Sequence, residues 1–219
     1  MYVAVLSFSG LLLAALSWGF SLRLAPDRRG SSLQDLDISR QVLLGAMLIL
    51  IGTGGGLLAT VSLGERPSTI AFALFASVTP ALAAIDAFSH RLPFAFSGGA
   101  LVLGLVCFGV DALSSGVVQL QRAALAFLVV GVLALVWWWG FGGQVGLGDV
   151  MLLAVIGFYT GWWSWAAVWA GVTLGFLLAA VAALVGRWRA GRGGGYLPLG
   201  PWLLGGCWGA VALAATRVL

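Results

Sequence analysis

Long apolar runs, separated by short connections that carry arginine, constrain this chain more than any other feature of its sequence. An α-helix needs about 20 residues to cross about 30 Å of hydrocarbon. Only 8% of the 219 residues are charged and 61% are hydrophobic, so too few polar side chains exist to coat a soluble fold. The sequence therefore predicts an all-α membrane helix bundle. The runs of sufficient length are 2–22, 42–63, 69–88, 95–113, 120–141 and 197–217.

The apolar stretch between residues 149 and 185 is too long for a single crossing. Small and polar residues between 157 and 161 interrupt it, and a tryptophan cluster follows at 162–165. We therefore expect a short helix at 149–160 and a long one at 163–186. This division brings the total to about eight transmembrane helices.

The eleven arginines test this division, because short cytoplasmic loops hold most of the positive charge of a membrane protein. With eight helices and the N-terminus outside, eight arginines fall on the cytoplasmic side and three on the other. A single span over 149–186 would change the ratio to five against six, so the eight-helix arrangement is favoured. The cytoplasmic eight are Arg23, Arg28, Arg29, Arg40, Arg91, Arg187, Arg189 and Arg192, and the other three are Arg66, Arg122 and Arg217.

Two of the seven acidic residues lie where an apolar helix begins or ends. Asp86 ends the third predicted span and Asp149 opens the sixth, so both are expected at the cytoplasmic face. Ionisable groups in or at the membrane are costly, which makes them candidates for function. When two carboxylates converge on one water, one keeps a proton and acts as acid while the other activates the water. The remaining acidic residues are expected to be solvated: Asp27, Asp35, Asp37, Glu65 and Asp111.

The residues around Asp149 suit such a pair. Gly146 and Gly148 allow the backbone to approach closely or bend, and an acidic group in a first helical turn faces the positive end of the macrodipole. Taken alone, Asp149 would be explained as an ordinary residue of a helix N-terminus. Asp86 is followed by a polar turn and then by Pro93, which can open the next helix.

These elements resemble the type IV prepilin peptidases, a family of intramembrane aspartic peptidases with a GxGD motif. The resemblance rests on Asp86 with Leu92-Pro93, on the segment from Gly146 to Asp149 two spans later, and on a late Pro-x-Gly-Pro element at 198–201. It covers residues from about 69 to 206. The chain departs from the family at Phe94, where Asp or Asn is frequent, and at Met151, where Lys is frequent.

The resemblance implies catalysis by Asp86 and Asp149 and divides the chain into two N-terminal transmembrane helices at 1–68 and a catalytic membrane domain at 69–219. The loop at 23–40 lacks the paired cysteines associated with the family's methyltransferase region, so a peptidase-only form is expected. Gly146, Gly148 and Pro93 would support the motif, and the candidates for substrate contact are Phe94, Met151, Pro198, Gly200 and Pro201.

By the same resemblance, the enzyme would lie in the bacterial cytoplasmic (inner) membrane with its active site facing the cytoplasm. Its substrates would be type IV prepilins, Flp/Tad-type prepilins or pseudopilins, cleaved after a glycine, just before the hydrophobic mature segment. The implied partners are this substrate, the lipid bilayer, and the assembly machinery of a pilus or of type II secretion.

Two other functions remain open on the sequence. A small membrane transporter or channel could use paired carboxylates to bind a cation, although such sites usually lie near the midplane. A catalytically inactive pilin-assembly component is the second, and Phe94 and Met151 favour it. We expect no cofactor, metal or nucleic acid, because His90 is a lone histidine and neither Cys107 nor Cys207 has a neighbour of metal-site spacing.

Overall fold

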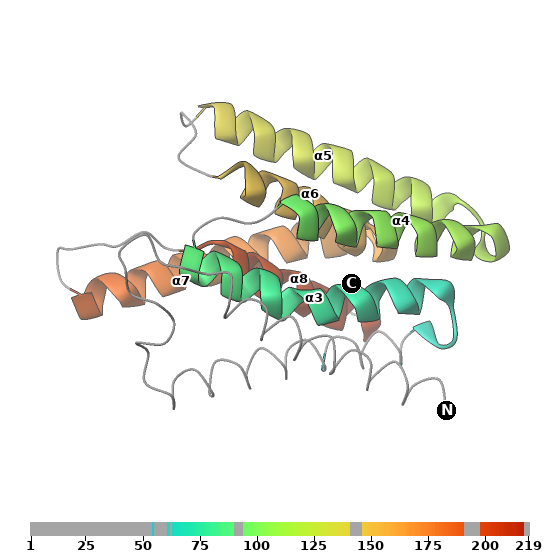
Figure 1. Ribbon diagram of the computed structural model, residues 1–219, viewed down its shortest axis with the longest axis horizontal. Coiled ribbons are helices and arrows are strands. Elements are labelled where there is room, and N and C mark those ends of the chain that lie inside the picture. Colours follow the sequence, from blue (N-terminus) through green and yellow to red (C-terminus); the bar gives the residue numbers. More distant parts are fainter. Residues whose placement is uncertain are drawn as a thin grey trace.

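The computed structural model describes residues 54, 61, 63–89, 94–140, 146–190 and 198–216, and within them the regular structure is entirely α-helical. The helices lie side by side along the long axis, and α3, α5 and α7 run opposite to α4, α6 and α8 (Figure 1). The predicted span at 2–22, most of the span at 42–63 and the loop at 23–40 lie outside the described residues. The helices are α3 (Pro67–Ser89), α4 (Phe94–Ser115), α5 (Val118–Gly140), α6 (Leu147–Trp163), α7 (Trp165–Ala190) and α8 (Gly200–Ala215).

The division of the long apolar stretch into two helices is confirmed, but its position is corrected. The break falls at Ser164, whose backbone is extended, and α6 continues through the small residues at which we expected it to end. A Cβ added at Gly157 would lie 2.8 Å from the carbonyl oxygen of Ala126, and one added at Gly161 would lie 2.6 Å from the Ala126 Cβ. These glycines therefore allow α6 to pack closely on α5, as small residues do in membrane helices, and do not interrupt it.

The end of α6 is capped by an arginine from another helix. The Nε of Arg122, near the start of α5, donates to the Gly161 carbonyl at 2.7 Å, and its Nη2 donates to the carbonyls of Trp162 at 2.6 Å and Trp163 at 2.7 Å. The last carbonyls of a helix have no partner within it, and a cation there also meets the negative end of the macrodipole. Arg122 therefore stabilises the last turn of α6.

Replacing Arg122 by glutamine is expected to lower the stability of the bundle by about 1–2 kcal/mol, because three carbonyls lose a charged donor. Thermal unfolding of the detergent-solubilised protein, followed by tryptophan fluorescence, measures this change. The neighbouring Gln121 is exposed, so Gln121→Ala is the matched control and should unfold at the wild-type temperature. Equal melting temperatures for Arg122→Gln and the wild type would show that the cap contributes nothing.

The outer helices carry the apolar surface that a membrane requires. Helices α4 and α5 and the part of α7 from Trp165 to Leu184 are long enough and apolar enough to cross a bilayer. Large apolar side chains remain exposed along all three, and so broad an apolar surface does not occur on an ordinary soluble protein. The chain is a membrane protein. Examples of the exposed side chains are Val102, Val106 and Leu113 on α4, Leu128, Val132 and Val136 on α5, and Leu177, Val181 and Leu184 on α7.

Four helices, α3, α4, α6 and α8, form a square that positions the candidate site. Both α3 and α6 pack against α4 and against α8, so α3 and α6 lie on one diagonal. Over about one turn of each helix, this diagonal is filled by rings, with Phe75 stacked on Tyr159 at a centroid distance of 4.2 Å. We call this set the aromatic layer: Phe72, Phe75, Phe108, Tyr159 and Trp163.

One end of the square holds the last turn of α3 and the first turns of α4, α6 and α8. We call it the aspartate end, because Asp86 and Asp149 lie in those turns. Helix α7 lies outside the square and packs closely on α8. A Cβ added at Gly206 of α8 would overlap the Gly175 nitrogen of α7 and lie 2.5 Å from the Gly171 carbonyl oxygen. This close packing holds α8, and with it the end of the Pro-x-Gly-Pro element, against the rest of the bundle.

Candidate functional site

Asp86 lies in the last turns of α3, and its side chain is bound by the first turn of α8. It is 4% exposed, and its Oδ2 accepts a hydrogen bond from the Gly200 N–H at 2.7 Å. Pro201 has no N–H, and the amides of Trp202 and Leu203 both donate to Leu199, so Gly200 holds the donor available to Asp86. An anion at this place also meets the positive end of the α8 macrodipole.

The same contact explains why residue 200 is a glycine. A Cβ added there would lie 2.7 Å from Oδ2 of Asp86 and 3.1 Å from its Cβ and Cγ. The carboxyl group therefore lies directly on the α8 backbone, where a side chain would displace it. Gly200 was expected to contact the substrate, and its contact with Asp86 is a role that the sequence did not predict.

Asp149 lies in the first turn of α6 and is 7% exposed. Its N–H donates to the Gly146 carbonyl at 3.0 Å, and its carboxyl group is hydrogen-bonded by the Gly146 backbone. The Oδ1 atom is buried and has no hydrogen-bond partner among the described residues. Gly146 has φ −69°, and a Cβ added there would lie 3.4 Å from Oδ2 of Asp149, an ordinary contact. Gly148 is half-buried in the same turn.

The structure brings the two predicted aspartates together. Starting from the stack of Phe75 on Tyr159, eleven residues along α3 lead to Asp86 and ten residues back along α6 lead to Asp149. At a rise of 1.5 Å per residue, these paths are about 16 Å and about 15 Å long, so the carboxyl groups lie at the same depth. They lie near enough across the diagonal of the square for the charge of Asp86 to act on Asp149. The carboxyl pair therefore lies well beyond the aromatic layer, at the aspartate end.

The other predicted site residues surround this pair less closely. Phe94 opens α4 and is 56% exposed, and Met151 is half-buried and packs against the core. Pro198 and Pro201 are half-buried on either side of the start of α8. Pro93 lies outside the described residues. Phe94 is therefore an exposed side chain at the aspartate end.

Asp111 was expected to be solvated, and this is wrong. The residue is 1% exposed, and its Oδ2 accepts a hydrogen bond from the Ser68 N–H at 3.3 Å. The first amides of α3 need an acceptor, and the last turn of the antiparallel α4 supplies one. This carboxyl group lies at the end of the square opposite to the aspartate end. Glu65, by contrast, is exposed as predicted.

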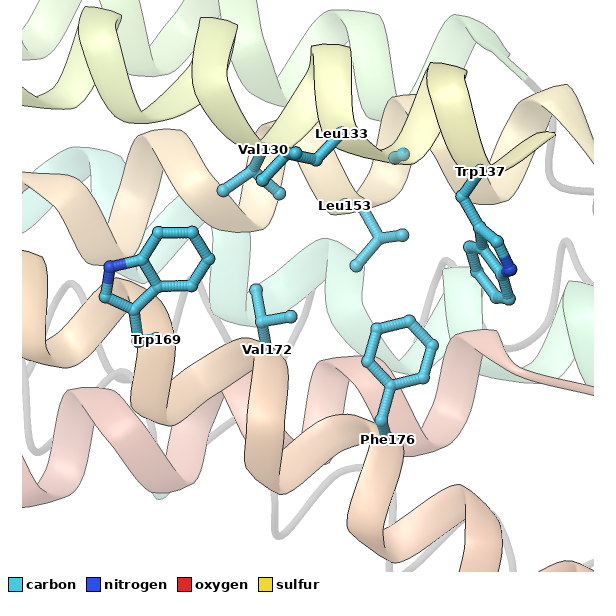
Figure 2. A pocket seen from close by; sticks show the side chains of 8 residues that line it. Val130, Leu133, Trp137, Leu153, Trp169, Val172 and Phe176 are labelled. Atoms are coloured by element: carbon cyan, nitrogen blue, oxygen red, sulfur yellow. The ribbon is translucent and has the colours of Figure 1, made fainter. Parts of the chain in front are cut away.

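An apolar pocket of about 270 Å³ lies beside the site, between α5, α6 and α7. Figure 2 shows side chains of α5 and α7 on either side of Leu153, which belongs to α6. Leu153 is one helical turn from Asp149, but the lining of this pocket contains no ionisable side chain. The lining residues are Val130, Leu133, Ala134, Trp137, Leu153, Trp169, Val172 and Phe176.

Comparison of the chain with family models, with curated proteins and with solved structures gave no match. The functional argument therefore rests on the sequence motifs and on the geometry of the four-helix square.

Proposed function

We propose that this protein is an intramembrane aspartic endopeptidase of the prepilin-peptidase type. The observation that carries the proposal is the pair of buried carboxyl groups, Asp86 and Asp149, which two different helices hold at one depth and at one end of the bundle. An isolated carboxyl group at a helix end is readily explained by capping. Two carboxyl groups that face each other away from water cost free energy. A reaction that needs a proton shared between them explains why both are present.

The contacts suggest a role for each aspartate in hydrolysis. Asp86 receives the Gly200 N–H and would act as the base that draws a proton from water, while the water oxygen attacks the carbonyl carbon of the scissile peptide. Asp149 would carry the shared proton and give it to the carbonyl oxygen. When the C–N bond breaks, the leaving nitrogen takes the proton from Asp86, and a hydroxyl of the tetrahedral intermediate returns its proton to Asp149 as the carbonyl reforms. The pair is then back in its starting state with one proton.

The proposal places the aspartate end in the cytoplasm of a bacterial cell, with the N-terminus outside and eight helices in the inner membrane. The arginine distribution supports this orientation, and Arg187 and Arg189 lie in the last turn of α7, at the same end as the two aspartates. The basic leader of a prepilin would remain in the cytoplasm. Its apolar mature segment would approach from the bilayer, past the exposed helices.

The first test is cleavage itself. Purified protein in liposomes, incubated with a candidate prepilin, is expected to shorten it to a product whose N-terminus follows a glycine. Mass spectrometry reads both the cleavage position and the absence of N-terminal methylation. A prepilin with a bulky residue in place of that glycine is the matched substrate control and should stay full length.

The same liposomes distinguish the competing functions. Prepilin left intact, together with movement of a cation or of protons through the protein, would replace the peptidase proposal by the transport function. Intact prepilin that nevertheless copurifies with the folded protein would favour a non-catalytic assembly component.

A further inference from the structure

A buried serine lies at the aspartate end and is not explained by packing. Ser97 is 1% exposed, and its Oγ has no hydrogen-bond partner within the described part of the chain. A buried hydroxyl without a partner loses the hydrogen bonds that it makes in water, so such groups are rare and call for a cause. The residue is not among those that the sequence motifs single out.

Ser97 faces the inside of the square. It belongs to the buried face of α4, on which residues recur every three or four positions. This face contacts α6 where the Tyr159 hydroxyl donates to the Ala100 carbonyl at 2.8 Å, and it contacts α3 where Phe108 meets Phe72 at a centroid distance of 5.5 Å. Ser97 is one turn before Ala100 on the same face, closer to the aspartate end.

Its depth matches that of the carboxyl pair. A Cβ at Gly104 would lie 2.9 Å from the Tyr159 hydroxyl, which sets α4 against α6. Seven residues back from Gly104 lead to Ser97 and ten back from Tyr159 lead to Asp149, or about 10 Å and about 15 Å. Side chains lean toward the N-terminus of their helix, so Tyr159 reaches toward the aspartate end and reduces this difference. Ser97 and Asp149 therefore lie within about one helical turn in depth.

Each helix of the square thus brings one polar group to the same end. These groups are the Asp86 carboxyl from α3, the Ser97 hydroxyl from α4, the Asp149 carboxyl from α6 and the Gly200 N–H from α8. The α3–α8 side is closed by the hydrogen bond between Asp86 and Gly200. On the α4–α6 side, Ser97 Oγ and Asp149 Oδ1 are both buried and both without a partner. Two such groups satisfy the requirements of a buried water molecule.

We propose that Ser97 and Asp149 together bind one buried water molecule, through which Ser97 orients the Asp149 carboxyl group. This inference rests on the proposed peptidase function for its activity readout. Ser97 is a positioning residue: it makes no contact with the scissile peptide, and it fixes the direction in which Asp149 offers its proton. Losing the hydroxyl should therefore slow the chemical step and leave substrate binding unchanged.

The test uses three substitutions in the full chain. Ser97→Ala is expected to lower kcat for prepilin cleavage about tenfold with KM and melting temperature unchanged, since one hydrogen bond to the acid is lost. Ser97→Thr keeps the hydroxyl and should retain activity within about threefold. Ser97→Gly leaves room for a second water and should fall between them. Infrared spectra of each variant, with the Asp149 bands assigned through Asp149→Asn, report on the carboxyl group without any substrate.

The cleavage rate and the infrared bands of Asp149 together test this inference separately from the peptidase proposal. A shift of the Asp149 bands in Ser97→Ala but not in Ser97→Thr supports the water, even if no prepilin is cleaved and the peptidase function fails. Unchanged Asp149 bands in Ser97→Ala overturn the inference, whatever the activity. A fall in activity that is equal for alanine and threonine, or that is accompanied by a lower melting temperature, also overturns it, since it indicates a packing role.

Discussion

Replacement of either aspartate by asparagine is expected to lower the rate of prepilin cleavage by at least about a thousandfold, because an amide neither accepts the proton of water nor donates one to the peptide. Asp86→Asn should keep the protein folded, since the asparagine oxygen still accepts the Gly200 N–H. Asp149→Asn replaces a buried protonated carboxyl group by a neutral amide of similar shape and should not destabilise the bundle. Single-turnover cleavage assays with each purified variant measure the loss.

Asp111→Asn is the matched control for both. Asp111 is also a buried carboxyl group that accepts a backbone N–H, in this case from Ser68, but it lies at the other end of the square. Its substitution should leave cleavage within about threefold of wild type, because it changes a cap and not the reacting groups. Cleavage that persists in Asp86→Asn or Asp149→Asn would contradict the catalytic pair. Equal losses in all three variants would point to folding instead.

Exchanging Gly200 for alanine is expected to reduce cleavage by about a hundredfold, through Asp86 and without a change of any acidic residue. The added methyl group would lie 2.7 Å from Oδ2 of Asp86, so either the carboxyl group or the first turn of α8 must move. Because the close packing of α7 on α8 resists movement of the helix, the carboxyl group is expected to turn away from its donor.

Gly205 offers a control on the same helix. A Cβ there would lie 3.5 Å from Cδ1 of Leu178, an ordinary contact, so Gly205→Ala should cleave at the wild-type rate. If Gly200 acts through Asp86, Gly200→Ala should add no further loss in an Asp86→Asn background. A wild-type rate for Gly200→Ala would show that this contact has no part in the reaction.

The positions of the described helices could be predicted from the sequence because each is a long apolar run, although only α4, α5 and part of α7 are long enough and apolar enough to cross a bilayer. The split of the stretch at 149–186 followed from the same rule, and its position was off because the cap of α6 comes from Arg122, 39 residues before Gly161. A cap supplied by another helix leaves no local signal. The glycines of α6 looked like a break, although they mark close packing on α5.

In the candidate site, too, features set by the local sequence could be predicted, and features set by contacts between distant residues could not. Asp86 and Asp149 could be paired from the sequence, since the predicted helix of Asp86 ends, and that of Asp149 begins, on the same predicted side of the membrane. The hydrogen bond from Gly200 to Asp86 joins residues 114 apart, and the burial of Asp111 depends on the start of α3 lying next to it. Ser97 was missed because a serine in an apolar run is usual in membrane helices. Only its position on the buried face of α4 distinguishes it.

The aromatic layer has a consequence for the energy supply of the cell. A hydrolytic site in a membrane must admit water and protons from one compartment without joining it to the other, since a leak would discharge the electrochemical gradient. Proton conduction requires an unbroken chain of hydrogen-bonding groups, and the Tyr159 hydroxyl, within the layer, is already engaged by the Ala100 carbonyl. In the proposed peptidase, the packed rings between this level and the far end would act as an insulator, so that a peptide bond could be broken on one side of an energised membrane.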